Sequence, residues 1–265
     1  MSLDREQPGT VESIYRLEAG FALAADRSIY TPGRFQGEPI TLPCNAYLIR
    51  RAGEWTLWDT GMPDELALEP EGRIIAHGLR GILPRTLRSQ LQEIGVVPDD
   101  IGTVILSHGH FDHVGNAALF RHATWVLQSA EFDAMVGPDA ARHGYRPELY
   151  EGLRDARLLL LDGDRDLFSD GSVSVIATPG HTPGHASLLV RTQGGRAIVL
   201  SGDVAHSSFN LEHRYVPTMN ADAEASRRSM ERIVDLVREE DAELWINHDP
   251  GHATAVPAGR AIFGW

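Results

Sequence analysis

The chain has 265 residues, 42% of them hydrophobic, which is enough to bury a complete core, and we expect one domain over 1–265. Its formal net charge of −13 disfavours nucleic acid or an anionic membrane surface as a partner. The single cysteine, Cys44, excludes an intrachain disulfide and fits a reducing compartment. Because neither a secretory signal pattern nor an apolar window of about 20 residues is present, we expect a cytoplasmic protein.

Short β-branched runs alternate with stretches of helical periodicity. In chain order, the predicted strands are 46–51, 55–61, 103–108, 124–128, 173–180, 186–192, 197–203 and 243–249. The predicted helices are 84–95, which Pro84 opens and Gly95 closes, and 221–240, where Met230, Ile233, Val234 and Val237 share one face. The less periodic segments 62–82 and 133–157 are predicted to be long loops that form pocket walls.

Two segments resemble each other within the chain. "NAYLIRRAGEWTLWDTG" (45–61) and "HASLLVRTQGGRAIVLSGD" (185–203) both read as a hairpin that ends in an Asp next to a Gly. Hairpins of this composition are common, so chance and duplication are both open explanations. Two similar halves would suit two sheets packed face to face with helices outside.

The segment "ILSHGHFDHVGN" (105–116) carries several metal-ligating side chains directly after an apolar strand. His108 and His110 are expected to project to the same side of an extended chain. The chain then turns into a helix start, which brings Asp112 and His113 toward the same point. Three other apolar strands end in the same way, and they supply His181, Asp203 and His248.

Five imidazoles and two carboxylates exceed what one catalytic zinc ion uses, so the pattern predicts two metal ions. We assign His108, His110 and His181 to metal 1, Asp112, His113 and His248 to metal 2, and Asp203 to both. A water held between the two ions would have a pKa of about 7 or below and supply hydroxide as the nucleophile. The ions are expected to be divalent; zinc is favoured, but this ligand set also accepts Mn, Fe or Co.

Two further interpretations concern the site and its surroundings. A purely structural zinc site is typically closed and often contains Cys, whereas this ligand set is free of Cys and has surplus capacity. Asp59, in "LWDTG", has two interpretations. Its carboxylate either accepts an imidazole N–H and fixes the tautomer of a ligand, or it forms a turn before Gly61.

These motifs resemble the metallo-β-lactamase superfamily, whose His-x-His-x-Asp-His pattern matches the four residues from His108 to His113. The resemblance runs from about Tyr47 to His252 and implies an αββα sandwich of two mixed sheets with the metals at one edge. Within the superfamily, "SHGHFDHVGN", "TPGHTPGHASLLV" and "NHDPGH" are similar to N-acyl homoserine lactone lactonases. Glyoxalase-II-like and flavodiiron-type branches fit less well.

The chain departs from this lactonase group at one position. The group commonly has a Tyr three residues after the bridging Asp, where its hydroxyl contacts the lactone carbonyl, and here that position is His206. Two roles are open for His206: hydrogen-bond donor to the developing oxyanion, or polar wall residue. His185 and His252 are expected to form hydrogen bonds or pack rather than coordinate, and His77 is expected to face solvent.

The resulting prediction is hydrolysis of a small lactone, with an N-acyl homoserine lactone as the favoured substrate and Asp112 carrying a proton to the leaving alkoxide. The predicted substrate wall is formed by Phe111, Met62, His143 and Tyr145. Three alternatives remain: another lactone such as 4-pyridoxolactone, a phosphotriester or other ester, and a metal-bound sensor without turnover. The resemblance is compatible with a homodimer.

Overall fold

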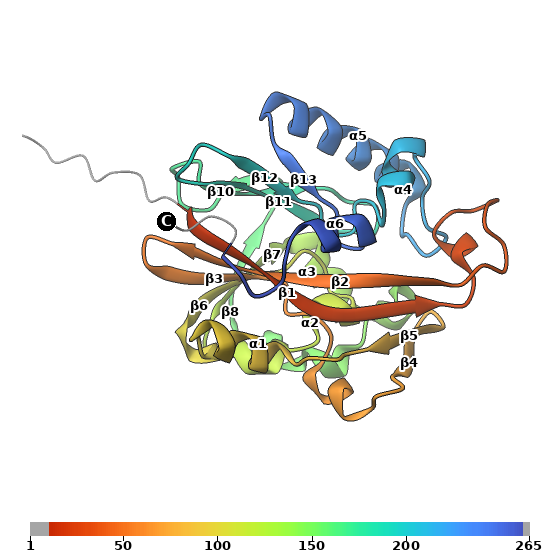
Figure 1. Cartoon of the computed structure of the whole chain (residues 1–265), viewed down its shortest axis with the longest axis horizontal. Helices are drawn as coiled ribbons and strands as arrows, with labels where there is room; N and C mark the ends of the chain where they lie inside the picture. Colours follow the sequence, from red (N-terminus) through yellow and green to blue (C-terminus); the bar gives the residue numbers. More distant parts are fainter. Residues whose placement is uncertain (1–10, 262–265) are drawn as a thin grey trace, which may run out of the picture.

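The computed structural model describes residues 11–261, in which two β-sheets stack face to face and helices cover their outer faces (Figure 1). This arrangement confirms the predicted αββα sandwich. In spatial order, sheet A contains β4 (Arg73–Ala76), β5 (Leu79–Ile82), β1 (Val11–Ala24), β2 (Ile40–Arg51), β3 (Glu54–Trp58), β6 (Ile101–Ile105), β7 (Thr124–Gln128) and β8 (Arg157–Leu161). Sheet B contains β13 (Glu243–Trp245), β12 (Ala197–Leu200), β11 (Ala186–Arg191), β10 (Val173–Ala177) and β9 (Arg165–Asp166).

The two longer helices predicted from the sequence are present on opposite outer faces. They are α1 (Leu87–Ile94), below sheet A in Figure 1, and α5 (Ala223–Glu239), above sheet B. The start of α1 lies three residues after Pro84 because the Thr86 hydroxyl accepts the Ser89 N–H and caps the helix. The other α-helices are α2 (Phe111–Val114), α3 (Ser129–Val136), α4 (Ser208–His213) and α6 (Pro250–Ala255).

Alternation along the strands divides the apolar side chains among three layers. On β2, Ala46 and Leu48 pack into the cluster between sheet A and α1, whereas Tyr47 and Ile49 pack between the two sheets. Met230 of α5 belongs to a third cluster, on the outer face of sheet B. Because both faces of the central strands are covered, consecutive residues such as Ala46 to Ile49 are apolar and buried.

Some strands were not predicted from the sequence. β1 is the longest, and polar residues interrupt its pattern; one of them, Arg16, is buried and donates to the side chain of Asn45 and to the carbonyl oxygen of Val256. The segment 62–82 was predicted to be a loop, but it contains the β4–β5 hairpin, whose strands have four residues each. Strands this short gain their stability from pairing, β5 with β1 and β4 with β5, rather than from their own pattern.

Four strands end at the edge where the predicted ligands lie. β6 ends three residues before His108, β12 three residues before Asp203 and β13 three residues before His248. β10 ends four residues before His181. β10, β12 and β13 run in the same direction in sheet B, so their carboxyl ends share one edge. The Ala186 N–H donates to the Ser107 carbonyl oxygen and ties the two sheets together at this edge.

Candidate metal centre

The structure brings three of the predicted ligands into one compact group. His110 Nδ1 lies 3.0 Å from His108 Nε2 and 3.0 Å from His181 Nε2. All three side chains are buried. This is the set that we assigned to metal 1.

Asp203 lies between this group and a second one. Its Oδ1 is 3.2 Å from His113 Nε2, and its Oδ2 is 3.1 Å from His248 Nε2 and 3.4 Å from His181 Nε2. Asp112 Oδ2 lies 3.8 Å from Nε2 of both His113 and His248. The position of Asp203 between the two groups is the one expected of a bridging carboxylate.

Each of the five imidazoles uses its other ring nitrogen in a hydrogen bond that fixes the ring. The partners are the Ser107 hydroxyl for His108, the His143 carbonyl for His110, Asp59 for His113, the Asn220 side chain for His181 and the Pro43 carbonyl for His248. With the ring protons on these outer nitrogens, the inner nitrogens point lone pairs at one another. This arrangement is typical of metal-binding histidines.

The donor set fits divalent metal ions. His113 Nε2 and Asp203 Oδ1 are buried and have no hydrogen-bond partner among residues 11–261. Buried polar atoms without partners are costly, and a cation between them would satisfy both atoms. Burial also lowers the pKa of His110 to about 4, and it lowers the pKa of His108 and of His181. These imidazoles are therefore neutral at neutral pH, the form that binds a metal.

Asp59 contacts the cluster from behind. Its Oδ2 lies 2.8 Å from His113 Nδ1 and accepts the Ser107 hydroxyl, and its Oδ1 accepts the Ser107 N–H. Of the two interpretations of Asp59, the contact with an imidazole is therefore the one seen. Asp59 is fully buried with φ of +59°, a left-handed conformation that costs free energy in a residue other than Gly and is often found at functional sites.

Glu131 of α3 was not predicted to belong to the site. Its Oε1 accepts the Gly109 N–H and the Tyr145 hydroxyl, and its Oε2 accepts the Gly184 N–H and the Thr182 hydroxyl. The buried carboxylate thus holds the loop with His108 and His110 against the loop with His181. Only these contacts, distant in sequence, reveal its role.

His185, which was expected to form hydrogen bonds rather than coordinate, holds the backbone of Asp203. Its Nε2 accepts the Asp203 N–H at 2.7 Å, while Nδ1 faces Thr178. Gly202, just before Asp203, has φ of +54°, and a Cβ at this position would lie 2.6 Å from His185 Nε2. The approach of His185 therefore requires a glycine at position 202.

A cavity opens onto the cluster. It is lined by Ala22, Tyr30, Ala76, His77, Leu79, His110, Phe111, Asp112, Gly144, His181, Asp203, His206, Met219 and His248. Phe111 was a predicted wall residue. His77, which was expected to face solvent, is exposed but also lies on this wall, at the turn between β4 and β5.

The remaining predicted wall residues are placed differently. Met62 is 1% exposed and belongs to the core outside sheet A. Tyr145 is also 1% exposed, and its hydroxyl is taken up by Glu131. These two side chains therefore do not form part of the cavity wall. His143 contributes its carbonyl oxygen to His110 rather than a lining side chain.

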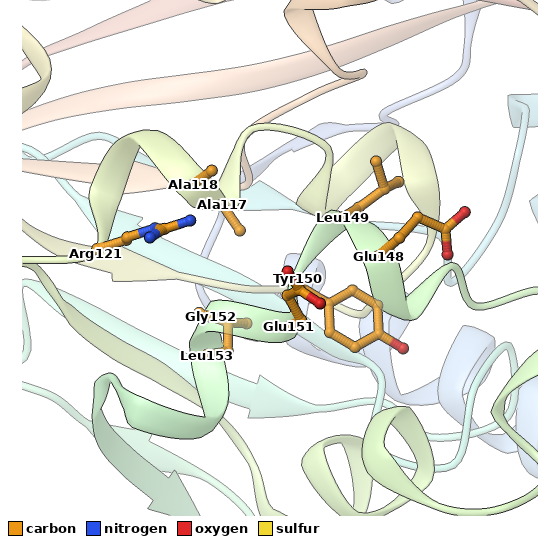
Figure 2. A pocket seen from close by; sticks show the side chains of 9 residues that line it. All are labelled: Ala117, Ala118, Arg121, Glu148, Leu149, Tyr150, Glu151, Gly152 and Leu153. Atoms are coloured by element: carbon orange, nitrogen blue, oxygen red, sulfur yellow. The ribbon is translucent and has the colours of Figure 1, made fainter.

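A separate cavity of about 50 Å³ lies near the 3-10 turns that follow α2 and precede β8. Figure 2 shows Arg121 and Glu148 on opposite sides of it, with Tyr150 between them. None of the seven predicted ligands lines this cavity.

Among residues 11–261, no helix is long and apolar enough to span a bilayer.

Comparison with known families agrees with this fold and site. The family model described as metallo-beta-lactamase superfamily matches residues 39–240. The chain therefore belongs to the metallo-β-lactamase superfamily, and it is a metal-dependent hydrolase.

Its relatives include characterised lactonases. An N-acyl homoserine lactonase of Bacillus thuringiensis is 30% identical over 249 residues, which cover 91% of this chain and 94% of the relative. The N-acyl homoserine lactonase AttM of Rhizobium radiobacter is 31% identical, covering 81% and 84%. A solved N-acyl homoserine lactone hydrolase with N-hexanoyl-L-homoserine at its catalytic metal centre has a TM-score of 0.83 at 25% identity, covering 96% of this chain and 100% of that structure.

Proposed function

We propose that this protein hydrolyses the ring ester of an N-acyl homoserine lactone with the help of two divalent metal ions, for which we favour zinc. The observation that carries the proposal is the double cluster around Asp203, with five oriented imidazoles beside a cavity. The relatives named above, which act on such lactones, supply the substrate class.

In this proposal the residues divide as their contacts suggest. His108, His110 and His181 would hold one ion, Asp112, His113 and His248 the other, and Asp203 both. When bound, the two ions would supply Lewis acidity toward the lactone carbonyl and would lower the pKa of water. Because the side chains are already fixed, little reorganisation is needed when the substrate binds.

Asp112 is the group we propose for proton transfer. Its Oδ2 faces the Cys44 thiol at 3.3 Å, and its carboxylate borders the cavity. A carboxyl group at this place can hold the proton that the ring oxygen must receive when the ester C–O bond breaks. The products would be the carboxylate and the free hydroxyl of the opened ring.

The test is a pH-stat assay of metal-loaded protein across an acyl-chain series of homoserine lactones, with metal content measured on the same sample. We expect acid release that depends on two metal ions per chain. Metal-bound protein that releases no acid from any of these lactones would contradict the proposal and favour a sensor without turnover.

A compact heteroaromatic lactone is the second candidate substrate. His206 replaces the Tyr of the lactonase group. This replacement is the reason to test a different and more compact ring, such as that of 4-pyridoxolactone. The ratio of kcat/KM for N-hexanoyl homoserine lactone to that for 4-pyridoxolactone decides between them, and an aryl phosphotriester in the same assay tests the third candidate activity.

A further inference from the structure

At the position where the lactonase group commonly has a Tyr, this chain has His206, which carries no hydroxyl. His206 Nε2 lies 3.4 Å from Asp203 Oδ2, and its ring stacks on His248 with a centroid separation of 5.2 Å and an interplanar angle of 15°. Its Nδ1 is buried and unpartnered among residues 11–261. The imidazole therefore faces the bridging carboxylate.

Tyr30, from a distant part of the sequence, lies over this histidine. It follows the 3-10 turn Arg27–Ile29 in the loop between β1 and β2, which Figure 1 shows beside α4. The Tyr30 and His206 rings are 4.9 Å apart between centroids, and Tyr30 is 3% exposed. Both side chains line the cavity at the metal cluster.

The backbone around Tyr30 is held in place. Its carbonyl oxygen accepts the Asn210 side-chain amide of α4 at 2.7 Å, and the Ile29 carbonyl accepts the Thr218 N–H at 2.8 Å. The loop is thus tied to the same segment that follows His206. A side chain held in this way can present its hydroxyl at a fixed point.

The Tyr30 hydroxyl is suited to donate a hydrogen bond. No hydrogen bond joins it to another side chain or backbone group within the described part of the chain. Burial raises the pKa of Tyr30, and the charges of Asp112, Cys44 and Asp203 raise it further, so the phenol keeps its proton at neutral pH. These groups border the place where the ester would react.

We propose that the Tyr30 hydroxyl donates the hydrogen bond to the lactone carbonyl oxygen that the lactonase group obtains from a Tyr at the position of His206. This inference rests on the proposed lactonase function. The proton stays on the phenol throughout. The hydrogen bond strengthens as negative charge accumulates on the carbonyl oxygen, so it lowers the barrier more than it tightens substrate binding.

Tyr30→Phe tests the inference with N-hexanoyl-L-homoserine lactone as the probe. Removing one such donor should lower kcat/KM by about 10²-fold, mostly through kcat, with metal content and thermal unfolding unchanged. Tyr15→Phe, on the same strand-and-loop segment but packed against Trp55, is the matched control and should behave as wild type. The double variant Tyr30→Phe/His206→Tyr moves the hydroxyl to position 206. Its kcat/KM should be at least about tenfold higher than that of Tyr30→Phe alone.

Three different results would count against this inference. An active wild-type enzyme whose Tyr30→Phe variant keeps kcat/KM within about twofold overturns this inference and leaves the lactonase function in place. A wild-type protein that holds two metal ions but opens no lactone overturns the function and this inference together. A Tyr30→Phe variant that loses metal or unfolds at lower temperature would show a structural role and also overturn it.

Discussion

The metal cluster and the wall of its cavity are built in different ways. The cluster residues lie within a few residues of strand ends, are buried, and have a second hydrogen bond that fixes each imidazole. The wall brings together Tyr30, His77, Gly144 and Met219, which come from loops far apart in the sequence. The comparison predicts that metal binding rests on the rigid sheet edge, whereas contacts to the substrate rest on loops that can vary without disturbing it.

The largest expected effect comes from Asp203→Asn, because this carboxylate contacts both halves of the cluster. The change preserves shape but removes the charge that faces several imidazoles. We expect metal content to fall below two ions per chain and kcat/KM to fall by at least about 10³-fold. Metal analysis and the lactone assay on the same sample measure both quantities.

The exposed Asp235 of α5 offers a matched control, since Asp235→Asn makes the same chemical change on the helix that covers the outer face of sheet B. Full activity of Asp203→Asn with two bound ions would remove this residue from the site.

Asp59→Asn is expected to act more weakly, through His113. The amide NH2 would face either His113 Nδ1 or the Ser107 N–H, both of which now donate to the carboxylate, so the ring would be held less firmly. Loss of such an orienting partner typically costs about 10–100-fold in metal affinity or activity. Titration with a competing chelator measures the affinity. Unchanged affinity would mean that Asp59 serves only the turn.

Glu131→Gln tests whether the two loops of the cluster depend on one carboxylate. A glutamine has one acceptor oxygen, so its amide group would meet donors that now point at a carboxylate. We expect the free energy of unfolding of the metal-free protein to fall by about 1–3 kcal/mol. Urea denaturation measures it, with the exposed Glu148→Gln as control. If Glu131→Gln lowers the free energy of unfolding no more than Glu148→Gln does, the two loops stay together without the Glu131 carboxylate.

The smallest effect is expected from His77→Ala, at the exposed rim of the wall. Removal of the imidazole widens the entrance next to Gly144, where a Cβ would lie 2.0 Å from His77 Nε2. The preference for long over short acyl chains should rise by up to about tenfold, with metal content unchanged. A variant that loses metal would contradict the separation between wall and cluster.

The local pattern alone predicted much of the candidate site. Short β-branched runs indicate the strands, and metal-ligating residue types directly after one of them single out His108 to His113 without any knowledge of the fold. His181, Asp203 and His248 could be predicted because they too follow apolar strands, and the structure places them beside that segment. Asp59 left two interpretations open, since a turn and a contact with His113 require the same residue.

Tertiary structure alone decided the supporting contacts and the wall. Glu131 and Tyr30 have no signal in their own neighbourhoods, because the partners of Glu131 lie 14 to 53 residues away and His206 is distant from Tyr30 along the chain. Met62 and Tyr145 come from segments that suggest a wall, yet packing places both in the core. Periodicity and ligand chemistry are read over a few residues, whereas the side of a sheet on which a loop settles depends on the packing of the whole chain.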